Sequence, residues 1–173
     1  MLLAVLTISD RCSRGEMTDT AGPAVVELLL GQWPEADIRT SLSPDDEGAI
    51  ATELHRLCTE GAGLVLTVGG TGLGPRDRTP EALGALFERR LDGFGELFRA
   101  LSFAEIGAAA MLSRADAGVV GHALVFLLPG SPAAVRLAME RLIVPELAHA
   151  VGQMRRASGR HVEAEGPHGH GGR

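Results

Sequence analysis

The chain has 173 residues, of which 45% are hydrophobic, and its formal net charge at pH 7 is −6. This length and composition predict a single domain with a substantial core, which we expect to span residues 1–156. The negative charge argues against general nucleic-acid binding, because such binding relies on clustered Lys and Arg. No apolar run approaches the length of a transmembrane helix, so we expect a cytoplasmic protein without a membrane partner.

Strand-like and helix-like segments alternate along the chain. The first segment, Leu3–Ile8, has no basic leader or cleavage site, so we expect a strand and not a signal peptide. In chain order the predicted elements are strand Leu3–Ile8, helix Gly22–Leu30, strand Asp37–Leu42, helix Asp46–Cys58, strand Leu64–Val68, helices Pro80–Arg90 and Phe94–Ile106, strands Ala117–Val120 and Leu124–Leu128, and helix Pro132–Met154.

This alternation predicts an α/β fold with a mostly parallel sheet that is covered by helices on both faces. Gly121-His122 between the last two strands indicates a hairpin, and therefore one antiparallel strand. Pro145 should kink or restart the last helix. We expect residues 157–173 to be a disordered tail; loose metal binding by its histidines (His161, His168 and His170) is the less favoured alternative.

The two cysteines, Cys12 and Cys58, match neither a disulfide framework nor a zinc site. Cys58 continues an apolar helix face, so we expect it in the core. Cys12 lies in a polar loop, where a nucleophilic role is a weak alternative because no histidine and acid accompany it.

A glycine-rich loop is the most informative segment of the chain. Gly69, Gly70, Gly72 and Gly74 follow an apolar strand, and Arg76, Asp77 and Arg78 lead from them to Thr79-Pro80-Glu81, which has the pattern of a helix start. Such a loop brings backbone N–H groups and a helix N-terminus to an anion, and so predicts a phosphate site. The spacing matches neither a P-loop nor the dinucleotide fingerprint.

Other polar segments also follow predicted strands. Hydroxyl–proline pairs at Ser43-Pro44, Thr79-Pro80 and Ser131-Pro132 are each predicted to open a helix, and Ser9-Asp10 follows the first strand. In an open α/β sheet these segments meet at the carboxyl edge of the strands, where ligands bind. We expect Asp46 to complement a helix dipole.

Asp45 and Asp77 suit Mg²⁺, which takes few protein oxygens and leaves its other positions to water and phosphate. Asp77 stands between two arginines and should stay ionised. Because no convincing protein nucleophile accompanies them, these residues point to phosphoryl or nucleotidyl transfer, which depends on positioning and charge stabilisation.

Val68-Gly69-Gly70-Thr71-Gly72 with Arg76-Asp77-x-Thr79-Pro80 resembles the molybdenum cofactor biosynthesis domain of the MoaB/Mog group. The likeness extends over residues 2–155. It includes the segments Ser9-Asp10-Arg11, Pro44-Asp45, Gly93-Phe94-Gly95-Glu96, Leu112-Ser113-Arg114 and Leu128-Pro129-Gly130-Ser131-Pro132.

The resemblance implies a three-layer α/β/α fold and a homotrimer, or a hexamer built from trimers. It also implies that molybdopterin's terminal phosphate attacks the α-phosphorus of ATP, with Mg²⁺ as cofactor, in a pathway shared with other molybdenum cofactor biosynthesis proteins. Asp45 and Asp77 correspond to the critical aspartates. The residues implied in substrate binding are Ser9, Asp10, Gly69, Gly70, Thr71, Gly72, Arg76, Thr79, Glu96, Ser113, Gly130, Ser131 and Pro132, with a solvated helix position as the alternative for Glu96 and a cap or turn for Ser113.

The chain departs from the family pattern at Asp92, where proline is frequent, and its short length places it nearer the MoaB type. Three functions remain open. The leading one is a molybdopterin adenylyltransferase; the others are a catalytically silent carrier or scaffold that binds molybdopterin, and an unrelated phosphate-sugar or nucleotide enzyme. The apolar face of the helix over 94–106 is expected to be either a subunit contact or core.

Overall fold

The computed structural model describes residues 1–157, and the three tail histidines lie outside this range. Its strands are β1 (Leu2–Ile8), β2 (Ile38–Ser43), β3 (Ala62–Val68), β4 (Arg89–Arg90), β5 (Asp116–Val120) and β6 (Ala123–Leu128). Its helices are α1 (Asp10–Ser13), α2 (Ala21–Gln32), α3 (Glu47–Thr59), α4 (Thr79–Gly84), α5 (Asp92–Ile106), α6 (Pro132–Ala138) and α7 (Val144–Ala157), with a 3₁₀ segment η1 (Gly107–Leu112) and a π-helical segment η2 (Met139–Ile143). Within this range, no helix is long and apolar enough to cross a membrane.

The strands form one sheet in the order β2-β1-β3-β6-β5-β4. β2, β1, β3 and β6 are parallel, whereas β5 pairs antiparallel with both β6 and β4. One strand therefore runs against the others, which confirms the predicted sheet. The order of the strands reverses between β1 and β3, and ligands bind at such switch points in open α/β sheets.

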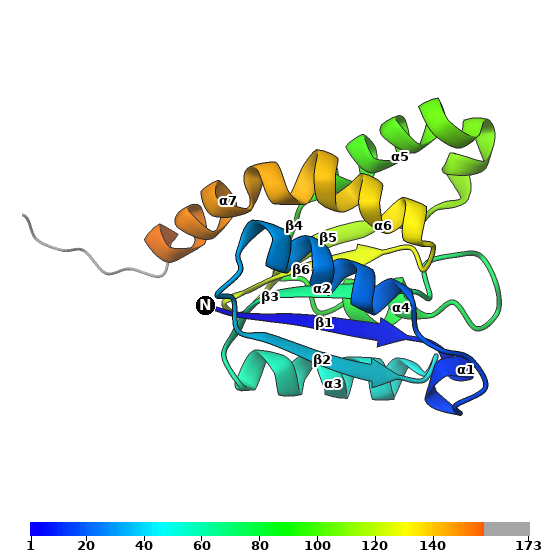
Figure 1. The fold of residues 1–173 in the computed structure, drawn as a ribbon, viewed down its shortest axis with the longest axis horizontal. Helices are drawn as coiled ribbons and strands as arrows, with labels where there is room; N and C mark the ends of the chain where they lie inside the picture. The colour runs from blue at the N-terminus through cyan, green and yellow to red at the C-terminus, as the bar shows by residue number, and fades with distance from the viewer. Residues whose placement is uncertain (158–173) are drawn as a thin grey trace, which may run out of the picture.

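Helices cover both faces of the sheet (Figure 1). Side chains alternate between the two faces of each strand: Leu3 and Val5 of β1 join the core under α2, α5, α6 and α7, whereas Ala4 and Leu6 join the core under α3 and α4. All residues of β6 are buried, as expected for a central strand with helices on both sides. The three-layer α/β/α fold is confirmed.

The helix predicted over 80–90 is too long. α4 ends at Gly84, and Arg89–Arg90 forms the short edge strand β4 against β5. The Phe87 ring packs on Gly118 of β5, where a Cβ atom would be 2.7 Å from a ring carbon. Pairing and packing against β5 outweigh the helix propensity of this segment, which is a weak local preference.

The helical segment after β6 changes its winding just before Pro145, as predicted. Proline has no N–H, and its ring clashes with the carbonyl four residues earlier. The π-helical segment η2 separates α6 from α7, and the Val144 N–H donates to the Met139 carbonyl. This wider turn lets the chain pass Pro145 and continue as a helix.

Cys12 is buried, whereas Cys58 is partly exposed. Cys58 packs half-buried against the core under α3 and α4, and burial raises the pKa of its thiol. Cys12 is buried in α1, where its N–H donates to the Ser9 hydroxyl at 3.2 Å. Cys58 therefore packs with the core as predicted.

Candidate active site

Four loops meet at the carboxyl edge of the parallel strands, after β1, β2, β3 and β6. Backbone hydrogen bonds continue the pairing beyond the strand ends. The Ser9 N–H donates to the Ser43 carbonyl at 2.9 Å, and the Gly69 N–H donates to the Leu128 carbonyl at 2.9 Å. The loops are thus held side by side, at the switch point of the sheet.

A cavity of about 390 Å³ opens among these loops. Eight of the residues predicted to form the site line it, namely Gly69, Gly70, Thr71, Gly72, Asp77, Ser113, Gly130 and Ser131. The opposite wall comes from α5 and includes Phe98, Ser102 and Ile106. A smaller cavity of about 130 Å³, lined by Ser9 and Cys12, shares Gly69 and Gly130 with it. The site therefore has an apolar wall on α5 and a polar wall of loops.

The first two glycines of the loop are required by its geometry. Gly69 has φ +107° and Gly70 has φ +65°, a region that L side chains rarely adopt. A Cβ atom at Gly69 would overlap the Ile8 carbonyl oxygen, and one at Gly70 would overlap the Thr79 hydroxyl. The backbone here runs too close to its neighbours for any side chain.

Thr79 fastens the glycine loop to the start of α4. Its buried hydroxyl donates to the Gly69 carbonyl at 2.8 Å, and its N–H donates to the Gly70 carbonyl at 3.0 Å. Thr79-Pro80 opens α4 as predicted, but Thr79 is the first residue of the helix and Arg78 stands at the N-cap position. The hydroxyl closes the loop and does not cap the helix.

The other two predicted helix starts differ from one another. Ser131 is the N-cap of α6 and accepts the Ala134 N–H at 3.3 Å, with Pro132 next in the chain, as predicted. The Ser43-Pro44 prediction is wrong, since Ser43 still belongs to β2. Asp46 caps α3 and accepts the Ala49 N–H at 2.9 Å, which confirms its role at a helix start.

Asp77 closes the outer part of the glycine loop. Its Oδ2 accepts the Gly74 N–H at 2.8 Å, and its own N–H donates to the Gly74 carbonyl at 3.0 Å. The two arginines that flank Asp77 in the sequence pair with carboxylates of other segments, Arg76 with Asp10 after β1 and Arg78 with Glu47 at the start of α3.

Asp10 and Asp45 hold the loops after β1 and β2 together by reciprocal hydrogen bonds. The Asp10 N–H donates to Asp45 Oδ2 at 2.7 Å, and the Asp45 N–H donates to Asp10 Oδ1 at 3.1 Å. Arg76 forms an ion pair with the remaining oxygen of Asp10. These contacts bring a residue of the glycine loop to the Asp10–Asp45 pair.

The pKa values of the Asp10 and Asp45 carboxyl groups shift in opposite directions. Desolvation raises the pKa of Asp45, and the negative charges of Asp10 and Asp77 raise it further. Desolvation also acts to raise the pKa of Asp10, but the Asp45 N–H and the Arg76 guanidinium outweigh it, so the pKa of Asp10 is lowered. Within this pair, a positive charge on Arg76 compensates Asp10 directly, whereas the charge of Asp45 is opposed by its desolvation and by two neighbouring carboxylates.

Asp45 and Asp77 each have one carboxylate oxygen, Oδ1, without a hydrogen-bond partner in the described part of the chain. Over the same residues, no group of three or more His, Cys, Asp or Glu side chains could hold a metal alone. Mg²⁺ needs only one or two carboxylates when phosphate oxygens and waters complete its shell. The donor set therefore fits Mg²⁺ that binds together with a phosphate ligand.

Eight of the fifteen predicted residues line this cavity and Ser9 lines the smaller one, whereas Asp10, Asp45, Arg76 and Thr79 line neither. Glu96 is exposed on α5, in the solvated position that was its alternative, and neither it nor Pro132 lines the cavity. Two residues had no role in the sequence analysis. Ser102 is a buried polar residue on the cavity wall, and Arg114 contacts the glycine loop. A small polar residue one helical turn after the apolar Phe98 is a signal that identifies Ser102 in retrospect.

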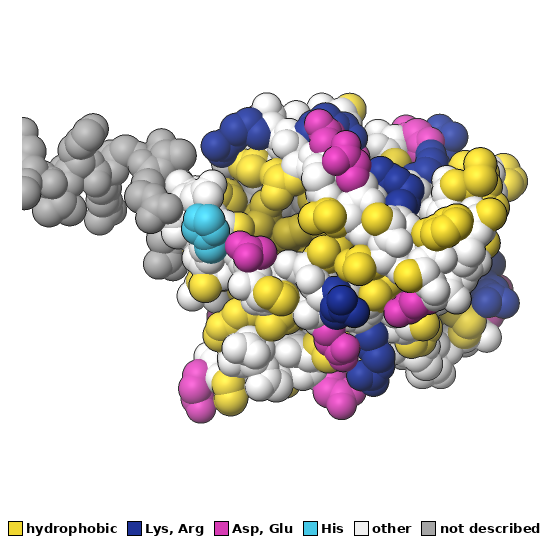
Figure 2. All heavy atoms as spheres, turned by 90° about the horizontal axis from the view of Figure 1, so that it is seen from above, with side chains coloured by type: hydrophobic (Ala, Val, Ile, Leu, Met, Phe, Trp, Pro, Cys, Tyr) yellow, Lys and Arg dark blue, Asp and Glu magenta, His cyan; other side chains and the backbone are white. Residues whose placement is uncertain are grey.

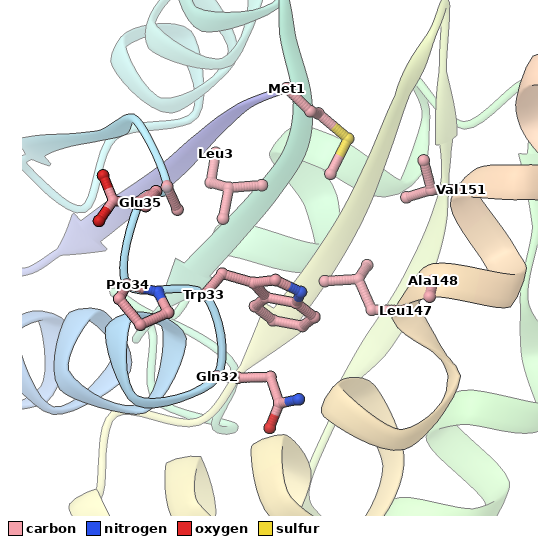
Figure 3. A pocket seen from close by; sticks show the side chains of 10 residues that line it. Met1, Leu3, Gln32, Trp33, Pro34, Glu35, Leu147, Ala148 and Val151 are labelled. Atoms are coloured by element: carbon pink, nitrogen blue, oxygen red, sulfur yellow. The ribbon is translucent and has the colours of Figure 1, made fainter.

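Another cavity, of about 570 Å³, lies at the amino end of β1 (Figure 3). Trp33 stands at its centre, with Leu3 on one side and Leu147 on the other. Its walls are mainly apolar, and it lies away from the loops that follow the parallel strands. A phosphate ligand is therefore better matched by the cavity beside the glycine loop.

Comparison with known proteins identifies the family of this chain. Residues 4–149 match the family described as "Probable molybdopterin binding domain". Molybdenum cofactor biosynthesis protein B of Staphylococcus aureus (strain Mu50) is 43% identical over 153 residues, covering 87% of this chain and 90% of the relative. The protein of the same name from Bacillus cereus is 44% identical over 153 residues, covering 88% and 89%.

Solved structures agree with these relatives. The tungsten cofactor synthesizing protein MoaB from Pyrococcus furiosus superposes with a TM-score of 0.82 at 37% identity, covering 89% of this chain and 96% of that one. The molybdopterin biosynthesis enzyme MoaB from Thermus thermophilus gives a TM-score of 0.79 at 41% identity, covering 88% and 95%. The chain therefore belongs to the MoaB-type molybdenum cofactor biosynthesis family.

Proposed function

We propose that this protein transfers AMP from ATP to the terminal phosphate of molybdopterin. An oxygen of that phosphate attacks the α-phosphorus, and the bond from this phosphorus to the bridging oxygen of the β-phosphate breaks. The products are adenylylated molybdopterin and pyrophosphate. No protein nucleophile is needed, in keeping with a site whose thiol, Cys12, is buried and whose other groups are carboxylates, hydroxyls and backbone.

One observation carries this proposal. Asp45 and Asp77, from loops 32 residues apart in sequence, each use one oxygen for the fold and leave the other free beside the glycine loop. When bound, Mg²⁺ neutralises phosphate charge and orients the triphosphate. Free carboxylate oxygens beside a phosphate-binding loop are what such an ion requires from the protein.

The chain's other residues have roles in binding and orientation. The backbone of Gly69 and Gly70 is held close to the ligand by Thr79, because its hydroxyl fixes the turn. Arg76 is 66% exposed and anchored by Asp10, so it presents a positive charge at the margin of the site. Ile106 of α5 is exposed and lines the cavity, so it supplies an apolar surface on which a flat ring can pack. These features suit a ligand with both a heterocycle and phosphates.

The direct test is to incubate the protein with molybdopterin and Mg-ATP and to measure adenylylated molybdopterin by mass spectrometry. We expect product with the wild type and none with Asp45→Ala. Asp37→Ala is the matched control, because Asp37 is an exposed aspartate whose ion-pair partner is Arg39. Tight molybdopterin binding without product in the wild type would instead identify a silent carrier or scaffold.

Assembly as a homotrimer or hexamer is also a proposal, as are the cytoplasmic location and a partnership with other proteins of the pathway. Phe94 and Phe98 of the apolar face of α5 are buried in the core, but Leu97 is 57% exposed and Met111 in η1 is 76% exposed. Figure 2 shows apolar side chains among charged ones on the molecule's upper face. Light scattering on the purified protein gives its mass in solution, and a monomer would contradict this part.

A further inference from the structure

Arg114 contacts the glycine loop through its side chain and its backbone. Its Nε donates to the Gly72 carbonyl at 2.9 Å, and a terminal nitrogen donates to the Asp77 carbonyl at 2.7 Å. The other terminal nitrogen forms an ion pair with Glu81 of α4. The Arg114 N–H donates to the Thr71 carbonyl at 3.1 Å. One residue thus holds both ends of the segment 72–77 and the helix that follows it.

The segment that carries Arg114 is itself fixed by α5. Arg99 of that helix donates to the Ala115 carbonyl at 3.1 Å. Helix and segment are in close contact, because a Cβ atom at Gly95 would be 2.7 Å from the Ala115 carbonyl oxygen. Arg114 therefore extends from a rigid support toward the loop.

The loop needs such a support. Leu73, Gly74, Pro75 and Arg76 are all exposed, and the hydrogen bonds within this segment join Gly74 to Asp77. A short exposed loop with so few internal contacts opens easily. The carboxylate of Asp77 belongs to this loop, so its position depends on what holds the loop ends.

We propose that Arg114 is a positioning residue that fixes the Asp77 carboxylate opposite Asp45. The catalytic part of this inference rests on the proposed function. All three guanidinium nitrogens of Arg114 are engaged within the chain, so the residue acts through the loop and not on the ligand. The planar guanidinium spreads its donors over three nitrogens in a fixed fork and so reaches three separated acceptors, whereas the three donors of a lysine ammonium share one nitrogen.

The first experiment measures loop opening without any substrate. Hydrogen–deuterium exchange is followed by mass spectrometry on peptides covering residues 69–79 of the full chain, in Arg114→Ala, Arg114→Lys and the wild type. We expect exchange in these peptides to rise by at least about tenfold in Arg114→Ala and by less in Arg114→Lys. Peptides from β1 and β3 should be unchanged.

Arg56→Ala is the matched control. Arg56 also forms two ion pairs from one guanidinium, with Glu53 of α3 and with Glu60 just after that helix, so its loss should leave exchange over residues 69–79 unchanged. Unchanged exchange in Arg114→Lys as well as Arg114→Ala would overturn the inference. If Arg114→Ala does not fold, Arg114→Lys alone decides the matter.

The second experiment tests catalysis. In Arg114→Ala we expect kcat for adenylyl transfer to fall by at least about tenfold, the Mg²⁺ concentration for half-maximal rate to rise, and millimolar guanidinium to restore part of the rate. A loosened loop with full activity and unchanged Mg²⁺ dependence would overturn the positioning role. If the wild type makes no adenylylated product, the proposed function fails, whereas the exchange result still decides whether Arg114 holds the loop.

Discussion

Gly70→Ala should damage both the stability and the chemistry of this protein. Gly70 has φ +65°, and an added Cβ atom would overlap the buried Thr79 hydroxyl and lie 3.3 Å from Asp45 Oδ1. The hydroxyl cannot move without losing its 2.8 Å hydrogen bond to the Gly69 carbonyl. The methyl group therefore acts on a structural contact and on a carboxylate of the site at once.

The expected cost has two parts. A left-handed conformation costs a non-glycine residue about 1–2 kcal/mol, and a lost buried hydrogen bond costs about 1 kcal/mol more. Gly121→Ala should carry only the conformational cost, because Gly121 has φ +58° and an added Cβ atom would meet nothing within 4 Å. Both variants stiffen the unfolded chain equally, so that contribution cancels in their difference. Gly70→Ala should thus be less stable than Gly121→Ala by about 1 kcal/mol or more.

Urea unfolding of the two variants measures this difference. A double-mutant cycle of Gly70→Ala and Thr79→Ala isolates the overlap, because in the Thr79→Ala background the added methyl group no longer meets a hydroxyl. In the transfer assay Gly70→Ala should lose at least about tenfold in rate through the displaced Asp45, and Gly121→Ala should lose nothing. Equal stabilities for Gly70→Ala and Gly121→Ala would refute the reasoning.

Three further changes test other parts of the site. Asp77→Asn keeps an acceptor for the Gly74 N–H, so unfolding in urea should change by less than about 1 kcal/mol, while the transfer rate falls at least about 100-fold. The pKa of Asp45 is raised, and the site needs this carboxylate ionised. As the pH is lowered, the transfer rate should therefore begin to fall at a higher pH than it would with an ordinary aspartate. Asp10→Asn removes a neighbouring negative charge and should shift this acid limb of the pH–rate profile to lower pH. Asp46→Ala removes the cap of α3 and should cost about 1 kcal/mol in urea unfolding without changing the rate.

Local signals made much of the fold and part of the site predictable. The parallel strands β1, β3 and β6 are apolar runs buried on both faces. The glycine loop lies between a strand and Thr79-Pro80, so its place at the sheet edge follows from topology. Ser131 is a cap next to its own helix. In each case the residues that interact are neighbours in sequence or in the sheet.

Long-range pairings of charged side chains were not predictable. Arg76 and Arg78 flank Asp77 in sequence but reach Asp10 and Glu47, and Arg114 is the arginine that contacts the Asp77 backbone. No periodicity or motif specifies which carboxylate a flexible arginine will meet across such distances. The edge strand β4 was missed for a related reason, since two residues pair there only because β5 is beside them.

The two carboxylate oxygens of Asp45 have different roles, one structural and one proposed to be chemical. Asp45 Oδ2 accepts the Asp10 N–H and holds two loops together, while Oδ1 has no partner in the range 1–157. An asparagine retains an acceptor for the backbone N–H but loses the charge, whereas an alanine loses both. Asp45→Asn should therefore stay folded and bind molybdopterin without transferring AMP, and Asp45→Ala should in addition loosen the loop after β1. If the two variants had equal stability and equal loop exchange, the hydrogen bond between these loops would have no structural role.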